Sequence, residues 1–181
     1  FFGTLYNTYS FFVLYANIDK FNYSENEIKI GNRPEIDRWI LSELNTLIKN
    51  VDKFYFDYEP TKVARAISDF TVEILSNWYV RLSRRRFWKG DYELDKISAY
   101  QTLYTCLITI SKLAAPIAPF FMDKLFLDLT NNISKTNEES VHLSSFPTSN
   151  ALLIDSNLER KMKYAQKISS LTLSLRAKEK I

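Results

Sequence analysis

The stretch EIDRWILSELNTLIKNVDKF, residues 35–54, shows the periodicity that decides the fold class of this chain. Its apolar residues recur in steps of four, four, three, four and three: they are Ile36, Ile40, Leu44, Leu47, Val51 and Phe54. This spacing places them on one face of an α-helix. Pro34 precedes the stretch and suits the first turn of a helix. We therefore expect a long amphipathic helix that begins near Pro34.

Helical spacing also occurs on both sides of this stretch. We expect a first helix over residues 2–17 and, after Pro60, a third helix that runs to about Trp88 and ends at Gly90. A fourth helix follows, with Asp95 as its N-cap. The prolines of APIAP, residues 115–119, stop or kink that helix, and helical spacing resumes over residues 120–130.

The C-terminal part of the chain changes character twice. Residues 131–150 are polar, and within them SVHLSSF, residues 140–146, favours a short strand. A last helix is expected to start at a capping box formed by Ser156 and Glu159. Its predicted inner face consists of Leu158, Met162, Ala165, Ile168 and Leu175.

Together these patterns predict an all-α fold, a helical bundle of about five or six helices. The chain has 181 residues, of which 46% are hydrophobic, so it is long enough to bury a core. Only 3 Gly and 5 Pro are available for turns, which favours long helices.

Composition also excludes several classes of site. One Cys and one His allow neither an internal disulfide nor a Cys/His zinc site, so we predict no metal site. Three glycines do not make a phosphate-binding loop, and no constellation of catalytic residues is visible. No apolar run approaches the roughly 18 residues of a membrane-spanning helix. The chain lacks an initiating Met and a signal peptide, and both ends suggest a piece excised from a longer protein.

One block of sequence concentrates the positive charge. LSNWYVRLSRRRFWKG, residues 75–90, contains no acidic residue, although the net charge of the whole chain is only +3. Its cations are Arg81, Arg84, Arg85, Arg86 and Lys89, and they lie beside Trp78, Tyr79, Phe87 and Trp88. A local basic patch of this kind favours an anionic partner.

The helical phase of this block raises a difficulty. The apolar stripe Val63, Ile67, Phe70, Ile74 and Trp78, continued at the same spacing, reaches Arg81, Arg85 and Trp88. Because an unpaired guanidinium is costly to bury, this end of the helix either carries ion pairs or lines an open groove. Asp69, Glu73 or the acidic residues of 91–95 are alternative partners for Arg81. One loop cannot pair with three consecutive arginines, since they point in different directions around a helix.

Arginine and exposed aromatic rings together are typical of RNA binding. Guanidinium groups pair with phosphates and aromatic rings stack on unpaired bases. The candidate RNA-binding residues are Arg81, Arg84, Arg85, Arg86, Phe87, Trp88 and Lys89, with Arg38 as a weaker addition. We expect the cations to hold phosphates and Trp88 or Phe87 to meet a loop base.

Residues 33–88 contain a family pattern. They resemble the anticodon-binding helical domain of class I aminoacyl-tRNA synthetases for branched aliphatic amino acids and methionine. LSNWYVRLSRRRFW, residues 75–88, is most similar to the isoleucine enzymes, and residues 98–121 and 140–147 also match them. The resemblance implies an N-terminal helix and connector over residues 1–32, an anticodon-binding bundle over 33–150, and a C-terminal helix over 151–181.

The resemblance also implies a partner and a parent activity. The partner would be the anticodon stem-loop of an isoleucine tRNA, and the parent a monomeric cytoplasmic ligase that uses ATP with Mg and holds Zn in a C-terminal region. The catalytic and C-terminal regions of the same polypeptide would be further partners. The sequence lacks His-x-Gly-His and Lys-Met-Ser-Lys-Ser, so we expect no cofactor and no catalysis in this chain itself.

Two alternatives stay open from the sequence. A bundle of this kind is shared with the valine, leucine and methionine enzymes, and a fold does not assign specificity. A helical protein-interaction scaffold could instead use SRRRFW, residues 83–88, to dock an acidic partner.

Overall fold

The computed structural model describes residues 1–23, 25–89, 91–131 and 138–179, and its regular structure is helical throughout these ranges. The long helices are α1 (Phe2–Asp19), α2 (Glu35–Phe56), α3 (Pro60–Asp69), η2 (Phe70–Val80), α4 (Arg81–Trp88), α5 (Leu94–Ala114), α6 (Pro119–Thr130) and α7 (Ser156–Lys178). Because α3, η2 and α4 join without a break, six long helices result. The predicted all-α bundle is confirmed.

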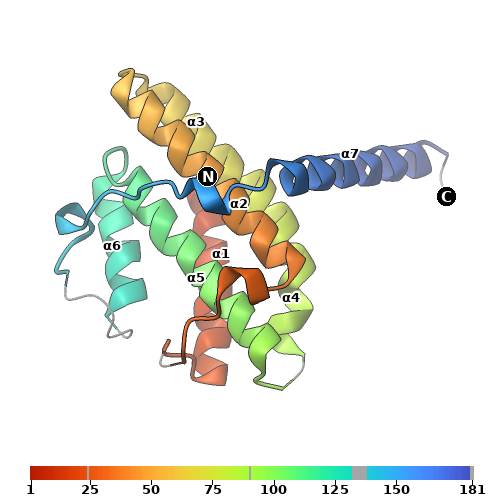
Figure 1. Ribbon diagram of the computed structural model, residues 1–181, viewed down its shortest axis with the longest axis horizontal. Helices are drawn as coiled ribbons and strands as arrows, with labels where there is room; N and C mark the ends of the chain where they lie inside the picture. Colours follow the sequence, from red (N-terminus) through yellow and green to blue (C-terminus); the bar gives the residue numbers. More distant parts are fainter. Residues whose placement is uncertain (24, 90, 132–137, 180–181) are drawn as a thin grey trace.

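The bundle forms around two central helices. α5 packs against α1, α2, α3, α4 and α6, while α2 packs against α3, η2, α5 and α7 (Figure 1). α5 is buried on almost all sides, which explains why its sequence is apolar or small and uncharged on most faces. α2 buries Ile40, Leu44, Leu47 and Val51 as its periodicity predicts.

The helix that contains the basic block is unusual because η2 is a π-helix of 11 residues. Hydrogen bonds from residue i to i+5 widen its turns, so the side chains return to the core one residue later than in an α-helix. The buried positions after Ile67 and Phe70 are Thr71, Leu75, Tyr79, Val80, Ser83 and Phe87. Ile74 and Trp78 of the predicted stripe are half-buried against the core, but its continuation to Arg81, Arg85 and Trp88 is exposed.

Two shorter predictions need correction, and the predicted end of the third helix near Trp88 is confirmed. Residues 140–146 form no strand, because Val141–Leu143 is a 3-10 turn whose N-cap Ser140 accepts a hydrogen bond from the backbone of His142. α5 begins at Leu94 with Glu93 as N-cap, so Asp95 lies in its first turn. α4 ends at Trp88 with Lys89 as its C-cap, and Gly90 lies outside the described residues.

The last helix, α7, leaves the bundle and extends toward the C terminus (Figure 1). Only its first turns are anchored: Leu158 is buried, and the Glu159 carboxylate accepts hydrogen bonds from Ser42 (2.6 Å) and Thr46 (2.9 Å) on α2. The predicted inner face is wrong beyond Met162, because Ile168 and Leu175 are more than half exposed.

The N-cap of α7 is Asp155 and not the predicted Ser156, and the stability of variants at these two positions can test this. The Asp155 carboxylate accepts from the backbone N–H groups of Asn157 (3.1 Å) and Leu158 (2.9 Å), while Glu159 binds α2 instead. Asp155→Ala should therefore lower the free energy of unfolding by about 0.5–2 kcal/mol. Ser156→Ala, one residue later, should have little effect in the same urea titration. Equal losses would argue against Asp155 as the cap.

None of the helices in the described ranges combines the length and the apolar character that crossing a membrane requires.

Candidate RNA-binding surface

One exposed face of α4 carries most of the basic block. Arg81, Arg84, Arg85 and Trp88 follow the i, i+3, i+4, i+7 spacing, so their side chains lie on the same side of the helix. All four are exposed, Trp88 to 60%, and Lys89 continues the exposed cations at the C-cap. We call Arg81, Arg84, Arg85, Trp88 and Lys89 the basic face. Within the described residues its cations make no ion pair.

Arg86 is turned away from this face and forms the main ion pair of the bundle. Its Nη1 and Nη2 atoms donate to the two carboxylate oxygens of Asp37 at 2.7 and 2.8 Å, a bidentate arrangement. Its Nε donates to the Asp95 carboxylate at 2.9 Å, and Nη2 also reaches the Asp95 carbonyl. The predicted role of Arg86 in holding phosphate is therefore not supported, since its guanidinium is engaged within the fold.

Asp37 is fully buried on α2 and joins three other elements. It accepts hydrogen bonds from the Tyr79 hydroxyl (2.9 Å) on η2 and the Ser98 hydroxyl (2.6 Å) on α5, in addition to Arg86 on α4. Burial raises the pKa of Tyr79, and the negative charge of Asp37 raises it further. Burial alone lowers the pKa of Arg86, but the hydrogen bonds and charge of Asp37 outweigh it, so that pKa is raised.

Phe87 also belongs to the core and cannot stack on RNA. It is 1% exposed, and its ring meets Phe11 and Tyr100 edge-on at centroid distances of 5.1 and 5.0 Å. Of the two aromatic residues predicted to meet a base, only Trp88 is therefore available. Arg86 and Phe87 attach the inner side of α4 to the bundle. The opposite side, which carries the basic face, therefore points to solvent.

The weaker candidate, Arg38, is exposed at the start of α2, one residue after Asp37. The ion pair of Asp37 with Arg86 brings this end of α2 beside α4. Trp39 is 1% exposed and belongs to the core, as expected.

A cleft of about 460 Å³ adjoins the basic face at Arg81. Its walls come from η2 and α4 on one side and from α7 on the other: Glu73, Asn77, Trp78, Arg81, Leu82, Ser169, Ser170 and Leu173. Sequence reasoning did not find this cleft, because its two walls lie about ninety residues apart in the chain.

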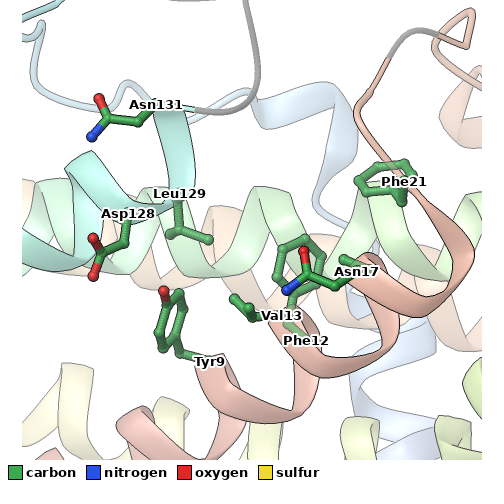
Figure 2. A pocket seen from close by; sticks show the side chains of 9 residues that line it. Tyr9, Phe12, Val13, Asn17, Phe21, Asp128, Leu129 and Asn131 are labelled. Atoms are coloured by element: carbon green, nitrogen blue, oxygen red, sulfur yellow. The ribbon is translucent and has the colours of Figure 1, made fainter.

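A second cavity, of about 380 Å³, lies between α1 and α6 (Figure 2). Tyr9, Val13 and Asn17 of α1 point toward Asp128 and Leu129 at the end of α6. Asp128 is paired with Lys124, and the residues that line the cavity include none from α4. This cavity is therefore separate from the basic face.

Comparison with known proteins assigns the family. Residues 37–181 match the family model described as the anticodon-binding domain of tRNA ligase. Because this match covers most of the chain, the protein belongs to that family, and the resemblance stated from the sequence is confirmed.

The curated relatives that match this chain are named as isoleucine–tRNA ligases. The chain is 62% identical to an isoleucine–tRNA ligase of Cytophaga hutchinsonii over its full length, and 59% identical to that of Bacteroides thetaiotaomicron. The isoleucine–tRNA ligase of Clostridium acetobutylicum is 47% identical over 97% of the chain. The chain spans only 16% of the length of the first two relatives and 17% of the third.

Proposed function

We propose that this chain is the part of an isoleucine–tRNA ligase that holds the anticodon stem-loop of an isoleucine tRNA. The observation that carries the proposal is the basic face, a stripe of exposed cations beside an exposed tryptophan. Arg81, Arg84, Arg85 and Lys89 would pair with phosphates, and Trp88 would stack on an unpaired base. The names of the relatives support isoleucine over valine, leucine or methionine.

The parent enzyme would join isoleucine to its tRNA at the expense of ATP, in the cytoplasm where translation takes place. The chemistry would belong to a catalytic region outside this chain, because the ATP-site motifs of class I synthetases do not occur in its sequence. The role of this chain would be to orient the tRNA, which is a contribution through binding and position.

A direct test removes two cations from the basic face. Arg84→Ala/Arg85→Ala should weaken binding of an RNA hairpin with the isoleucine anticodon stem and loop. It should also reduce the slope of log K against log salt by about 0.7–0.9 for each lost phosphate contact. Lys49→Ala/Lys53→Ala is the matched control, since it removes the same charge from exposed positions at the other end of α2. Unchanged affinity and slope in the arginine variant would contradict the assignment.

A hairpin with the valine anticodon separates phosphate binding from base reading. A preference for the isoleucine hairpin would mean that these helices read the anticodon themselves. Equal, salt-sensitive binding would leave this chain as a phosphate clamp. If any polyanion competes as well as the hairpin does, the alternative of a protein-docking patch for an acidic partner gains support.

A further inference from the structure

The cleft between η2 and α7 contains a set of polar groups that the fold itself does not use. Asn77 donates to Glu73 at 3.3 Å, which leaves the Asn77 carbonyl oxygen as a free acceptor among the described residues. The Ser169 and Ser170 hydroxyls and the Arg81 guanidinium also have no side-chain hydrogen bond in the part of the chain that the structure describes.

The wall formed by α7 is polar where an ordinary helix packing against a bundle would be apolar. Ser169, Ser170 and Leu173 line the cleft, whereas the exposed residues Ile168, Leu171 and Leu175 do not. The Gln166 Nε2 atom is buried without a hydrogen-bond partner among the described residues, one turn before the serines. Buried polar groups normally find partners, and this unpaired donor lies on α7 one turn from the two serines that line the cleft.

Trp78 gives the cleft an aromatic wall. Trp78 on η2 is half-buried: one part of its ring packs against the core, and it also lines the cleft together with Asn77 and Arg81. π-helical turns are rare and occur frequently at functional sites. The volume of about 460 Å³ is within the range of sites that hold small molecules.

From these features we infer that the cleft is a nucleobase site, in which an unstacked base of the bound RNA loop stacks on Trp78. This inference rests on the proposed function, since the basic face would deliver the RNA. Arg81 belongs to both the basic face and the cleft, so a phosphate held at Arg81 places the neighbouring base at the cleft mouth. Asn77, Ser169 and Ser170 supply donors and acceptors for the edge of the base.

Charge and polarity favour a base over an apolar protein segment. A packed apolar segment would leave the hydroxyls of Ser169 and Ser170 and the carbonyl oxygen of Asn77 without partners, at a cost in desolvation. A base satisfies them and offers its flat face to the indole ring.

The test compares two changes in the cleft with a control on the outer side of α7. Trp78→Ala removes the stacking ring, and Ser170→Trp fills the cleft from an exposed position that carries no core contact. Both should weaken hairpin binding about fivefold or more, because one stacked base contributes about 1–3 kcal/mol. Neither changes the charge, so the salt slope should stay the same. Leu171→Trp should bind as the unchanged chain does.

Abasic nucleotides identify the base. At one loop position, removal of the base should weaken binding to the unchanged chain but have no further effect on Trp78→Ala, since both changes remove the same contact. If the two changes are additive at every loop position, Trp78 holds no base and the inference fails.

Fluorescence provides a measurement that leaves the cleft intact. In Trp88→Phe the remaining indoles are Trp39, which is 1% exposed, and Trp78. Hairpin binding, followed separately by anisotropy of a labelled RNA, should quench the emission of this variant. Steep salt-dependent binding without quenching, and with full affinity in Ser170→Trp, would overturn the base site while the proposed function stands. No binding by the unchanged chain would overturn both.

Discussion

Asp37→Ala will lower the free energy of unfolding by about 3–5 kcal/mol, because it leaves the Arg86 guanidinium without its bidentate partner inside the bundle. The same change strands the Tyr79 and Ser98 hydroxyls, which both donate to this carboxylate. Urea unfolding followed by circular dichroism measures the loss directly.

Asp95→Ala is the control for this prediction. It also removes a carboxylate that contacts Arg86, but the Asp95 side chain is 58% exposed. Its loss should therefore cost about 0–1 kcal/mol. The double variant Asp37→Ala/Arg86→Ala should lose less than the sum of the two single variants, since neither charge is then buried alone. Similar small losses for Asp37→Ala and Asp95→Ala would mean that the buried pair does not hold α4 in place.

Phe87→Ala should be about as damaging, by about 3–5 kcal/mol, for a different reason. The ring fills the space between Phe11 of α1 and Tyr100 of α5, so its removal leaves a cavity where three elements meet. The measurement is again the free energy of unfolding.

Trp88→Ala, at the very next position, is the matched comparison. Trp88 is exposed, so its removal should change the stability by about 0.5 kcal/mol or less. It should instead weaken binding of the RNA hairpin. If Trp88→Ala destabilises the chain as much as Phe87→Ala does, the assignment of Phe87 to the core and Trp88 to the surface is wrong.

The periodicity of apolar residues was sufficient to predict the fold class and most helices. The face of α2 with Ile40, Leu44, Leu47 and Val51 is buried as expected, because apolar residues spaced three or four apart fall on one side of a long helix. Local signals were weaker at helix ends. Ser156 and Glu159 satisfy the pattern of a capping box, but Asp155 competes for the same N–H groups and Ser42 and Thr46 compete for Glu159.

The candidate site could be located from the sequence but not resolved into its parts. The cluster of arginine and tryptophan in residues 75–90 can be seen in the sequence without any knowledge of the structure. Which arginine is free depends on contacts with residues far away in the chain. The partner of Arg86 is Asp37, 49 positions earlier, and no pattern around Arg86 distinguishes it from Arg85.

The sequence by itself therefore determined the helices, the core residues of α2 and the position of the cationic block. The tertiary structure decided how that block is rotated. The π-helical turns of η2 shift the helix by one residue, which brings Phe87 inward and turns Arg81, Arg85 and Trp88 outward. η2 packs against α1 and α2, and its Tyr79 donates to the buried carboxylate of Asp37. Propensities along one segment do not encode such partners, so the width of these turns could not be read from the sequence.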